Sequence, residues 1–404
     1  MTNADTIPLG WRSAKVGDVL LETQYGLNIP SSSDGNMPIV GMKDLVDGRV
    51  IQTGLARVSI AKSEANRYLL REGDILLNRT NSADLVGKVG YIDGSLHAVF
   101  ASYLVRLKPN KSLIDPKFLT FWLSSSKGQE EIRPLITRGV SQANINPTAF
   151  CRRVAVPLPP LSEQRRIADI LATWDRAIGH ATQTKDHVEQ LYVSSSVRKI
   201  HFRGHSMRPL GDLLSLDRML VVEPDGPFRA LGIRSHGKGT FHRIDDLAAL
   251  GSTKIVYRIE PHRFVVNIVF AWEGAAAITS ADDTGCLVSH RFPTFTINEK
   301  LLNRDYFRHM IRMKSFRQLL ALASPGGAGR NRTLNRRDFL RFEIHVPPLD
   351  QQEPIAAALQ AVDRHVELLD RYLSCLTVQR NALATELLTG RRRVPGAALT
   401  AAAN

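Results

Sequence analysis

Apolar side chains recur at alternating steps of four and three residues in two long stretches of the chain. In the later stretch Arg380 interrupts a series whose apolar members are Ile355, Leu359, Val362, Val366, Leu369, Leu373, Leu376, Leu383 and Leu387. In the earlier stretch Lys185 interrupts a series made up of Ile167, Leu171, Trp174, Ile178, Ala181, Val188 and Tyr192. A stripe this narrow is typical of a coiled-coil seam. The pattern therefore predicts two long helices that pack on each other through these residues.

The two stretches also open with the same sequence. Residues 156–178 return 188 positions later as residues 344–366, and nine of the residues in the range 159–176 are identical to their partners. Each copy passes through two prolines to a residue that can cap a helix, Ser162 or Asp350. Matched openings favour helices that pack on each other. The alternative is two unrelated amphipathic helices that each cover their own domain.

Short strand-like pieces precede each predicted helix. In residues 10–158 these pieces lie at Met37–Val40, Val50–Gln52, Asp74–Leu77, Lys88–Ile92 and Ser102–Leu107. They are β-branched or alternating and are bounded by Gly, Asn and Asp, as strands are. Pro116–Ser125 and Gln129–Ile136 have the pattern of helices. Residues 208–346 repeat the same order with little sequence in common.

This order predicts an α+β protein with a pseudo-twofold internal duplication. Two mixed α/β domains are expected to be separated by two long helices that form an antiparallel coiled coil. The predicted segments are a first globular domain at 1–158, a first spacer helix at 159–204, a second globular domain at 205–346, a second spacer helix at 347–390 and a disordered tail at 391–404. Because the copies agree in the helices and differ in the globular domains, each globular domain is expected to meet its own target. The alternative is divergence without a function.

The composition indicates a polyanionic partner. The 404 residues are too many for one hydrophobic core, and they carry a net charge of +14 with a pI near 9.9. This charge predicts nucleic-acid binding, and a basic but inert surface is the alternative. Cys151, Cys286 and Cys375 have no short spacing, which predicts neither a disulfide framework nor a zinc site. Without an apolar signal segment or a run of 18 apolar residues, a cytoplasmic protein is expected.

Three segments approach known motifs without meeting them. Asn146–Phe150, NPTAF, lacks the second proline of the N-P-P-[YF] corner with which adenine methyltransferases hold their base. Ser324–Thr333, SPGGAGRNRT, lacks the lysine of a P-loop, but its glycines and arginines suit a loop on the DNA backbone; a flexible connector is the alternative. His201 and His205 are four residues apart with no third ligand nearby. No catalytic, cofactor or metal site is therefore expected.

Three segments together carry a resemblance to a known family. They are PPLSEQRRIADIL with its echo PPLDQQEPIAAAL, REGDILLNRT at Arg71–Thr80, and RGVSQANINPTAF at Arg138–Phe150. The chain resembles the specificity subunit of type I restriction-modification systems over essentially its full length. The second globular domain departs from the pattern, because EPHRFVVNIVFAWEG at Glu260–Gly274 stands where REGDILLNRT would be.

The resemblance implies a non-catalytic subunit that chooses the DNA sequence with two target recognition domains. It also implies that the chain holds two adenine methyltransferase subunits and nuclease subunits. S-adenosylmethionine, Mg and ATP are then expected on those partners, with no cofactor bound by this chain. The alternatives are a stand-alone DNA-binding adaptor or repressor, and a methyltransferase with unrecognised motifs.

Helices of about 40 residues would be roughly 60 Å long. Two domains separated by such a spacer are expected to read two half-sites of double-stranded DNA and to skip the base pairs between them, since a turn of DNA measures about 34 to 36 Å. Because the domains differ, the target is expected to be asymmetric.

Candidate DNA-binding residues are those polar or basic side chains whose type suits base edges or phosphates, since Arg pairs with guanine and Asn or Gln with adenine. They are Lys43, Asn78, Arg79, Asn81, Ser82, Lys88, Arg138, Ser141, Gln142 and Asn144 in the first domain, and Arg234, Lys238, Arg330, Asn331 and Arg332 in the second. Asn78 to Ser82 are expected on a polar loop after an apolar strand. For each residue, an ordinary solvated turn is the alternative.

Overall fold

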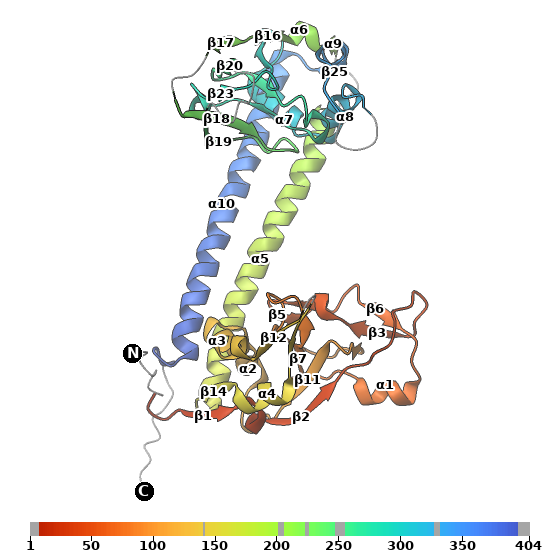
Figure 1. Ribbon diagram of the computed structural model, residues 1–404, viewed down its shortest axis with the longest axis vertical. Helices are drawn as coiled ribbons and strands as arrows, with labels where there is room; N and C mark the ends of the chain where they lie inside the picture. The colour runs from red at the N-terminus through yellow and green to blue at the C-terminus, as the bar shows by residue number, and fades with distance from the viewer. Residues whose placement is uncertain are drawn as a thin grey trace. The chain divides into compact units, whose positions relative to one another are not determined.

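The computed structural model describes residues 8–139, 142–200, 206–222, 226–246, 255–326 and 332–394. The chain divides into two compact units, which we call unit 1 (residues 1–181 and 372–404) and unit 2 (residues 182–371). Each unit contains one globular domain and one part of each long helix (Figure 1). The predicted segmentation set the helices apart from the domains. In the structure, each helix is instead divided between the two units.

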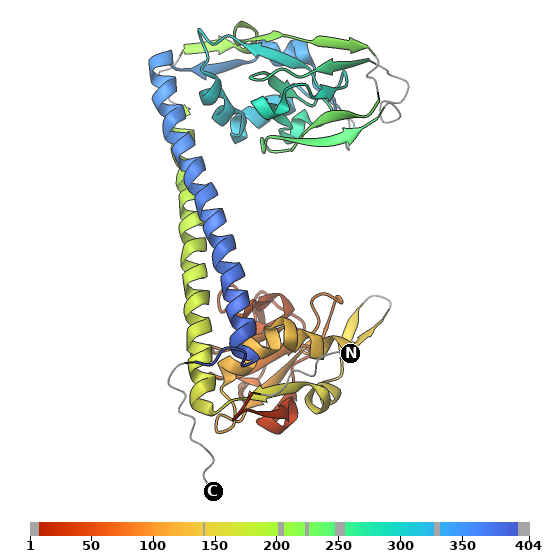
Figure 2. The same ribbon diagram turned by 90° about the vertical axis from the view of Figure 1, so that its left-hand side faces the viewer.

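The two long helices are α5 (Leu161–Ile200) and α10 (Leu349–Leu388). Both begin directly after the second proline, so the predicted capping positions Ser162 and Asp350 lie inside the first turn. The eleven residues predicted for the helix seam are all buried or half-buried: Ile167, Leu171, Trp174, Ile178, Ile355, Leu359, Val362, Val366, Leu369, Leu373 and Leu376. Within each unit the two helices lie side by side (Figures 1 and 2).

The two polar residues that interrupt the stripes make ion pairs between the helices. In unit 1 the Arg380 guanidinium donates to Asp175, with 2.9 Å between Nε and Oδ1. In unit 2 the Lys185 ammonium lies 2.6 Å from Oδ1 of Asp370. Hydrogen bonding to Asp370 raises the pKa of Lys185 above that of an ordinary lysine. Each interruption of the apolar series is therefore a charged contact from one helix to the other.

Unit 1 is built on a six-stranded mixed sheet in the order β2-β11-β7-β9-β5-β4, with smaller sheets β10-β3-β6, β12-β13-β8 and β1-β14. Its strands are β1 (Arg12–Lys15), β2 (Leu20–Tyr25), β3 (Met37–Val40), β4 (Leu45–Val46), β5 (Gly48–Val50), β6 (Ala56–Val58), β7 (Ile75–Asn78), β8 (Thr80–Asn81), β9 (Val89–Tyr91), β10 (Val99–Phe100), β11 (Leu104–Pro109), β12 (Ile136–Arg138), β13 (Ala143–Ile145) and β14 (Ala155–Leu158). Its shorter helices are η1 (Val16–Val19), η2 (Met42–Asp44), α1 (Lys62–Tyr68), α2 (Pro116–Ser124), α3 (Ser126–Ile132), η3 (Arg133–Leu135) and α4 (Pro147–Arg153).

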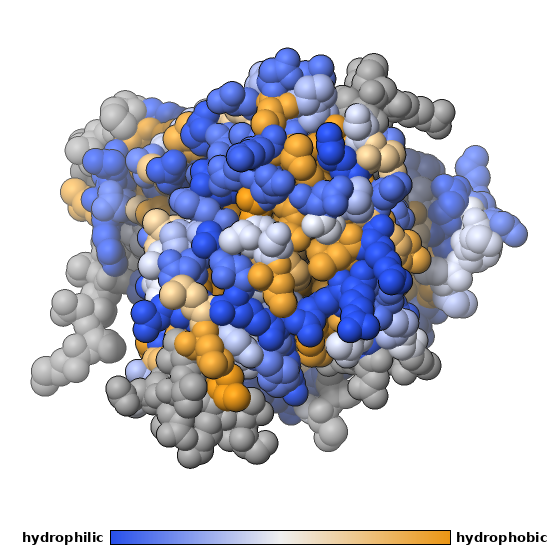
Figure 3. All heavy atoms as spheres, turned by 90° about the horizontal axis from the view of Figure 1, so that it is seen from above, coloured by the Kyte–Doolittle hydropathy of each residue, from blue (hydrophilic) through white to orange (hydrophobic). Residues whose placement is uncertain are grey.

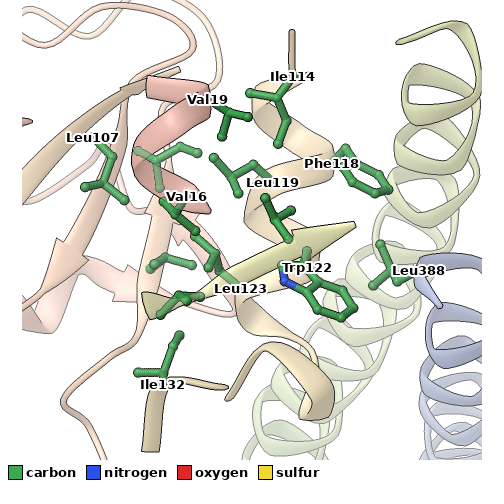
Figure 4. Packing of buried hydrophobic residues seen from close by; sticks show 14 of the residues in the cluster. Val16, Val19, Leu107, Ile114, Phe118, Leu119, Trp122, Leu123, Ile132 and Leu388 are labelled. Atoms are coloured by element: carbon green, nitrogen blue, oxygen red, sulfur yellow. The ribbon is translucent and has the colours of Figure 1, made fainter. Parts of the chain in front are cut away.

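β7 lies inside the large sheet because its side chains are apolar on both faces. Ile75 and Leu77 join one hydrophobic core, and Leu76 joins another. This division follows from the alternation of side chains along a strand. Figure 4 shows part of the first core, in which apolar residues of η1, α2 and α3 lie together and Leu388 of α10 lies next to Trp122.

The strand prediction is wrong at one hairpin. The strand expected at Val50–Gln52 lies at Gly48–Val50 instead, where it pairs with β4. Asp47 and Gly48 both have positive φ, 48° and 77°, which is the geometry of a two-residue turn of type I′. Asp-Gly is a strong signal for this turn, so the sequence does contain the information that places β5.

Unit 2 contains a four-stranded sheet, β16-β24-β21-β22, a five-stranded sheet, β17-β20-β23-β18-β19, and the pair β15-β25. Its described strands are β15 (Ser206–Pro209), β16 (Leu214–Leu216), β17 (Met219–Val222), β18 (Phe228–Ile233), β19 (Thr240–Asp245), β20 (Ile255–Arg258), β21 (Phe264–Val266), β22 (Ala276–Ile278), β23 (Leu287–Val288), β24 (Thr294–Ile297) and β25 (Glu343–Val346). Its shorter helices are α6 (Leu210–Leu213), η5 (Ala271–Glu273), η6 (Ala281–Asp283), α7 (Arg304–Ile311), α8 (Lys314–Leu322) and α9 (Arg336–Arg341).

The core of unit 2 is rich in aromatic rings. Phe264 of β21 contacts the rings of Phe295, Phe307, Phe316 and Phe339 at centroid distances of 5.2 to 6.2 Å. On its surface, apolar side chains stand among polar ones, as Figure 3 shows for the face seen from above. Some exposed apolar surface is normal for a folded domain.

The start of α5 is tied to the globular domain of unit 1 by one buried glutamine. The Gln164 amide donates to the carbonyl oxygens of Pro159 (2.9 Å) and Leu113 (3.2 Å). Its Oε1 accepts a hydrogen bond from the backbone N–H of Asp115 (2.8 Å). Asp115 is also the N-cap of α2, so one side chain joins two helix starts.

Gln352 repeats this arrangement in unit 2, and every partner lies 188 positions after its counterpart. The Gln352 amide donates to the carbonyl oxygens of Pro347 (2.7 Å) and Leu301 (2.9 Å). Its Oε1 accepts from the N–H of Asn303 (2.7 Å), the N-cap of α7. The duplication therefore preserves individual hydrogen bonds in addition to the order of elements.

Unit 1 also brings the described ends of the chain together at one buried carboxylate. Arg393 makes two hydrogen bonds to Glu163, at 2.8 and 2.9 Å, and the Glu163 side chain is fully buried. Trp11 donates its indole N–H to the same carboxylate over 3.2 Å. Arg393 also donates to the carbonyl oxygen of Leu9. Residues 391–394 of the predicted disordered tail are thus part of the fold, and residues 395–404 lie outside the described residues.

Candidate nucleic-acid interface

In unit 1 the segment that follows β7 pairs with a hairpin from much later in the sequence. β13 pairs antiparallel with β12 on one side and with β8 on the other. Ala143 of β13 is paired with Arg138 of β12 on one side and with Asn81 of β8 on the other, so one strand separates these two predicted residues. Thr80 donates its hydroxyl to Oδ1 of Asn144 over 2.6 Å. The small sheet therefore gathers predicted residues from the middle and from the later part of the domain's sequence.

Arg79 is held at the joint between β7 and β8. Its backbone N–H donates to the carbonyl oxygen of Tyr103 (3.0 Å), and its own carbonyl accepts from the N–H of Ile145 (2.9 Å). Its guanidinium lies over the ring of Tyr25, with Cζ 5.1 Å from the ring centroid. Tyr25 and Tyr103 are exposed to solvent. A stacked guanidinium beside exposed aromatic rings suits binding to nucleic acid.

Asn78 does not lie on a polar loop as predicted. It is the last residue of β7, and only 1% of its surface is exposed. Its backbone exchanges hydrogen bonds with Lys88 and Gly87, while its side-chain Oδ1 is buried without a partner among the described residues. A side chain so deeply buried is unsuited to reading a base edge.

Four more predicted residues of unit 1 are exposed: Lys43, Ser82, Lys88 and Gln142. Ser82 and Gln142 flank the small sheet, and the carbonyl of Lys88 accepts a hydrogen bond from the end of β7. Lys43 is separate from this group, because it lies in η2, next to the edge strand β4 of the large sheet. Ser141 lies outside the described residues.

In unit 2, Arg234 and Lys238 flank the turn between β18 and β19, and both are exposed. The Arg234 guanidinium donates to the carbonyl of Thr240 and lies over the ring of Phe241. Arg234 therefore also closes the turn, a structural role that the sequence did not predict. The turn is joined to η5 by a hydrogen bond from the N–H of Gly237 to the carbonyl of Gly274 (2.9 Å).

η5 carries Trp272, over which the guanidinium of Arg332 lies, with Cζ 5.4 Å from the ring centroid. The turn that carries Arg234 and Lys238 therefore contacts η5, and η5 carries Trp272, the aromatic partner of Arg332. Arg330 and Asn331 lie outside the described residues. The described members of the predicted DNA-binding residues of unit 2, Arg234, Lys238 and Arg332, therefore lie around η5.

Sequence reasoning did not select the aromatic residues Tyr25, Tyr103 and Trp272. Tyr25 precedes Arg79 by 54 positions, and the two meet only because β11 pairs with both β2 and β7. A second stack that was not predicted, Arg218 over Tyr257 at 4.7 Å, lies in unit 2. No local signal in the sequence pairs these rings with their arginines, because contacts such as that of Tyr25 with Arg79 depend on strand pairing.

Among the described residues, no group of His, Cys, Asp and Glu side chains is arranged to hold a metal ion. His201 and His205 lie outside that part of the chain. Within the same described part, no helix has both the length and the hydropathy needed to cross a bilayer.

Comparisons with known proteins agree with this architecture. The family model for the type I restriction modification DNA specificity domain matches residues 8–190 and 264–374. The type I restriction enzyme MjaVIII specificity subunit of Methanocaldococcus jannaschii is 26% identical over 427 residues, which cover 96% of this chain and 94% of that protein. The StySPI specificity subunit of Salmonella potsdam is 28% identical over 203 residues, covering 48% and 43%.

A solved structure has the same fold. The type I restriction-modification S subunit from M. genitalium superimposes with a TM-score of 0.59 and 12% sequence identity, over 96% of this chain and 98% of that one. The duplicated fold, the paired helices and the basic hairpin regions define a DNA-binding protein with two recognition units. More specifically, the chain belongs to the family of type I restriction-modification specificity subunits.

Proposed function

We propose that this chain reads a bipartite, asymmetric DNA target, with one half-site for each globular unit. One observation carries the proposal: the scaffolds of the two units are alike while the side chains at equivalent positions differ. The hydrogen bond from Ile145 to the carbonyl of Arg79 recurs as that from Leu334 to the carbonyl of Ile268, also 2.9 Å. At this shared junction, one unit presents an arginine side chain and the other an isoleucine.

The basic character of the chain fits this role. A net charge of +14 favours binding to phosphates, which positions a protein on DNA, and base contacts then select the sequence. Two readers with different side chains select two different half-sites, so the target has no twofold symmetry.

The chain acts, in this proposal, as a non-catalytic subunit that holds two adenine methyltransferase subunits and, in the complete enzyme, the nuclease subunits. Those partners would bind S-adenosylmethionine, Mg and ATP. Helix α10 exposes the apolar residues Leu368, Tyr372 and Val378, each more than half exposed. Apolar side chains on an otherwise polar helix are suited to contact with a protein partner.

The gap between the half-sites is set by the paired helices. Each helix has 40 residues, so its length is roughly 60 Å. In this proposal, buried apolar residues and the Lys185 and Arg380 ion pairs hold the two helices together, and the length of the helices sets the length of the unread gap.

An exchange of residues 208–342 for those of a relative with another target tests the proposal. The full chain is co-expressed with an adenine methyltransferase of a type I system, and modified adenines are mapped on genomic DNA. The expected result is a new sequence in one half of the target with the other half unchanged. A change in both halves would count against separate readers, and methylation by the chain alone would show that it is itself a methyltransferase.

A further inference from the structure

Both units place an arginine over an aromatic ring at the same structural junction, although the two arginines come from different segments. In each unit, a backbone hydrogen bond joins the segment just after a buried strand, β7 or β21, to the segment before the last short helix, α4 or α9. These bonds, Ile145 to Arg79 and Leu334 to Ile268, are 189 positions apart at both ends. They mark equivalent places in the two units.

In unit 1 the arginine comes from the strand side of this junction. Arg79 has its backbone fixed on both sides, and its guanidinium is stacked on Tyr25. Its Nε is buried without a hydrogen-bond partner among the described residues. The terminal amino groups are therefore the part of the guanidinium that is suited to a ligand.

In unit 2 the arginine comes from the opposite side of the junction. Arg332 lies two residues before Leu334, and its guanidinium lies over Trp272. The ring of Trp272 is itself held, because its indole N–H donates to the carbonyl oxygen of Val269 over 3.2 Å. The two units thus reach the same arrangement, a guanidinium on a ring, with unrelated residues.

Stacking matters because a free arginine loses rotamer freedom when it binds. A guanidinium already oriented on a ring loses less of that freedom, and its planar fork matches the O6 and N7 acceptors of guanine. The same fork can also bind a phosphate through two hydrogen bonds, but a phosphate contact carries no base preference.

We propose that Arg79 and Arg332 each read a guanine, one in each half-site, and that Tyr25 and Trp272 are positioning residues that orient them. This inference rests on the proposed function, because it names the base that each unit selects. It adds two aromatic residues to the interface and assigns a base to each arginine.

The test is selection of bound duplexes from a random library by the full-length chain, followed by sequencing and by affinity measurements on the selected site. Arg79→Ala should remove the preference for guanine at one position of one half-site and weaken binding to the selected site about 5- to 150-fold. Arg332→Ala should do the same at one position of the other half-site. Arg12→Ala, an exposed arginine on β1, is the matched control and should leave every base preference unchanged.

The aromatic residues are tested by paired substitutions. Tyr25→Ala should weaken binding about 2- to 5-fold, mainly to duplexes that carry the guanine, whereas Tyr25→Phe keeps the ring and should bind as the wild type does. Trp272→Ala and Trp272→Phe should behave in the same way for the other half-site. Rescue by phenylalanine distinguishes orientation of the arginine from a hydrogen bond through the tyrosine hydroxyl.

Three results would overturn the inference. If Arg79→Ala weakens binding to all sequences equally, and the salt dependence of binding falls by the amount expected for about one lost phosphate contact, Arg79 binds the DNA backbone. If both arginine variants alter the same half-site, the units do not read separately. If the wild-type chain selects no sequence, the proposed function fails first, and this outcome is recognised before any variant is compared.

Discussion

Gln164 and Gln352 are equivalent in the two units, so the effect of substituting one on stability can be compared with the same substitution of the other. Gln164→Met keeps the length of the side chain and removes three hydrogen bonds in a site that is 1% exposed. Each lost bond costs about 0.5 to 1.5 kcal/mol. The apolar volume is nearly conserved, so the cavity contribution is small. The free energy of unfolding of unit 1 should therefore fall by about 2 to 4 kcal/mol.

The assay is urea unfolding combined with hydrogen exchange read by mass spectrometry. The backbone N–H of Asp115 bonds to Gln164 and that of Asn303 bonds to Gln352. Gln164→Met should speed exchange at Asp115 and leave Asn303 unchanged, and Gln352→Met should do the reverse. Gln183→Met, an exposed position on α5, should change neither. A loss below about 0.5 kcal/mol with unchanged exchange at Asp115 would refute the reasoning.

A charged variant adds a pH signature. Gln164→Glu places a carboxylate against the carbonyl oxygens of Leu113 and Pro159, which accept hydrogen bonds and offer none. Burial and these oxygens should raise the pKa of the new carboxyl group above its unfolded value. The variant should then be least stable at pH values above that raised pKa and should recover as the pH falls from it towards the unfolded pKa.

Four further predictions concern single buried groups and the helices. Tyr306 has its hydroxyl buried without a partner among the described residues, and its counterpart 188 positions earlier is the fully buried Phe118; Tyr306→Phe should leave stability unchanged or raise it by about 1 kcal/mol in urea unfolding, and a clear loss would reveal an unseen partner. Burial lowers the pKa of His309 to about 4, with Arg312 and Arg308 acting in the same direction and Asp363 and Asp305 opposing. Because the folded state then binds fewer protons than the unfolded state, unit 2 should lose about 2 to 3 kcal/mol as the pH falls from about 6.5 to about 4. His309→Phe, the residue found at the equivalent Phe121, should flatten this dependence in thermal melts, and parallel curves would contradict it. Leu359→Ala should cost about 2 to 5 kcal/mol because Leu359 is 2% exposed; the half-buried Leu369 should cost less when changed to Ala, and equal losses would show that burial does not set the cost. Shortening both helices by one turn should shorten the unread gap by about one or two base pairs, and an unchanged gap in the mapped target would disprove the spacer role.

The helices were predictable from the sequence because their stripes record burial directly. Each of the eleven seam residues is at least half-buried, and the two polar interruptions pair across the helices. The bounds of the strands in unit 1 were harder to predict from the sequence. β3 matches its predicted bounds, whereas β5 was misplaced because the Asp47-Gly48 turn signal was passed over.

The candidate site was predictable only in part. Arg79 and Asn144 were selected for their chemistry, and the small sheet does bring their segments together. Asn78 was misjudged because a polar residue at a strand end resembles the start of a loop, and only the three-dimensional packing shows that it is buried. Tyr25 was missed because its contact with Arg79 passes through the pairing of β11 with two other strands, and no local pattern encodes that pairing.

The Glu163 carboxylate accepts hydrogen bonds from Arg393 and Trp11, and these residues are synthesised at different stages. The core of unit 1 includes Leu387, Leu388 and Val394 from near the end of the chain. The first globular domain is synthesised well before these residues, so it lacks their side chains until the whole of unit 2 has been made. Unit 2 is encoded entirely by an internal stretch and can close beforehand. Unit 1 is consequently begun before unit 2 and completed after it, and until then Glu163 lacks its partner Arg393 and part of the apolar core stays uncovered.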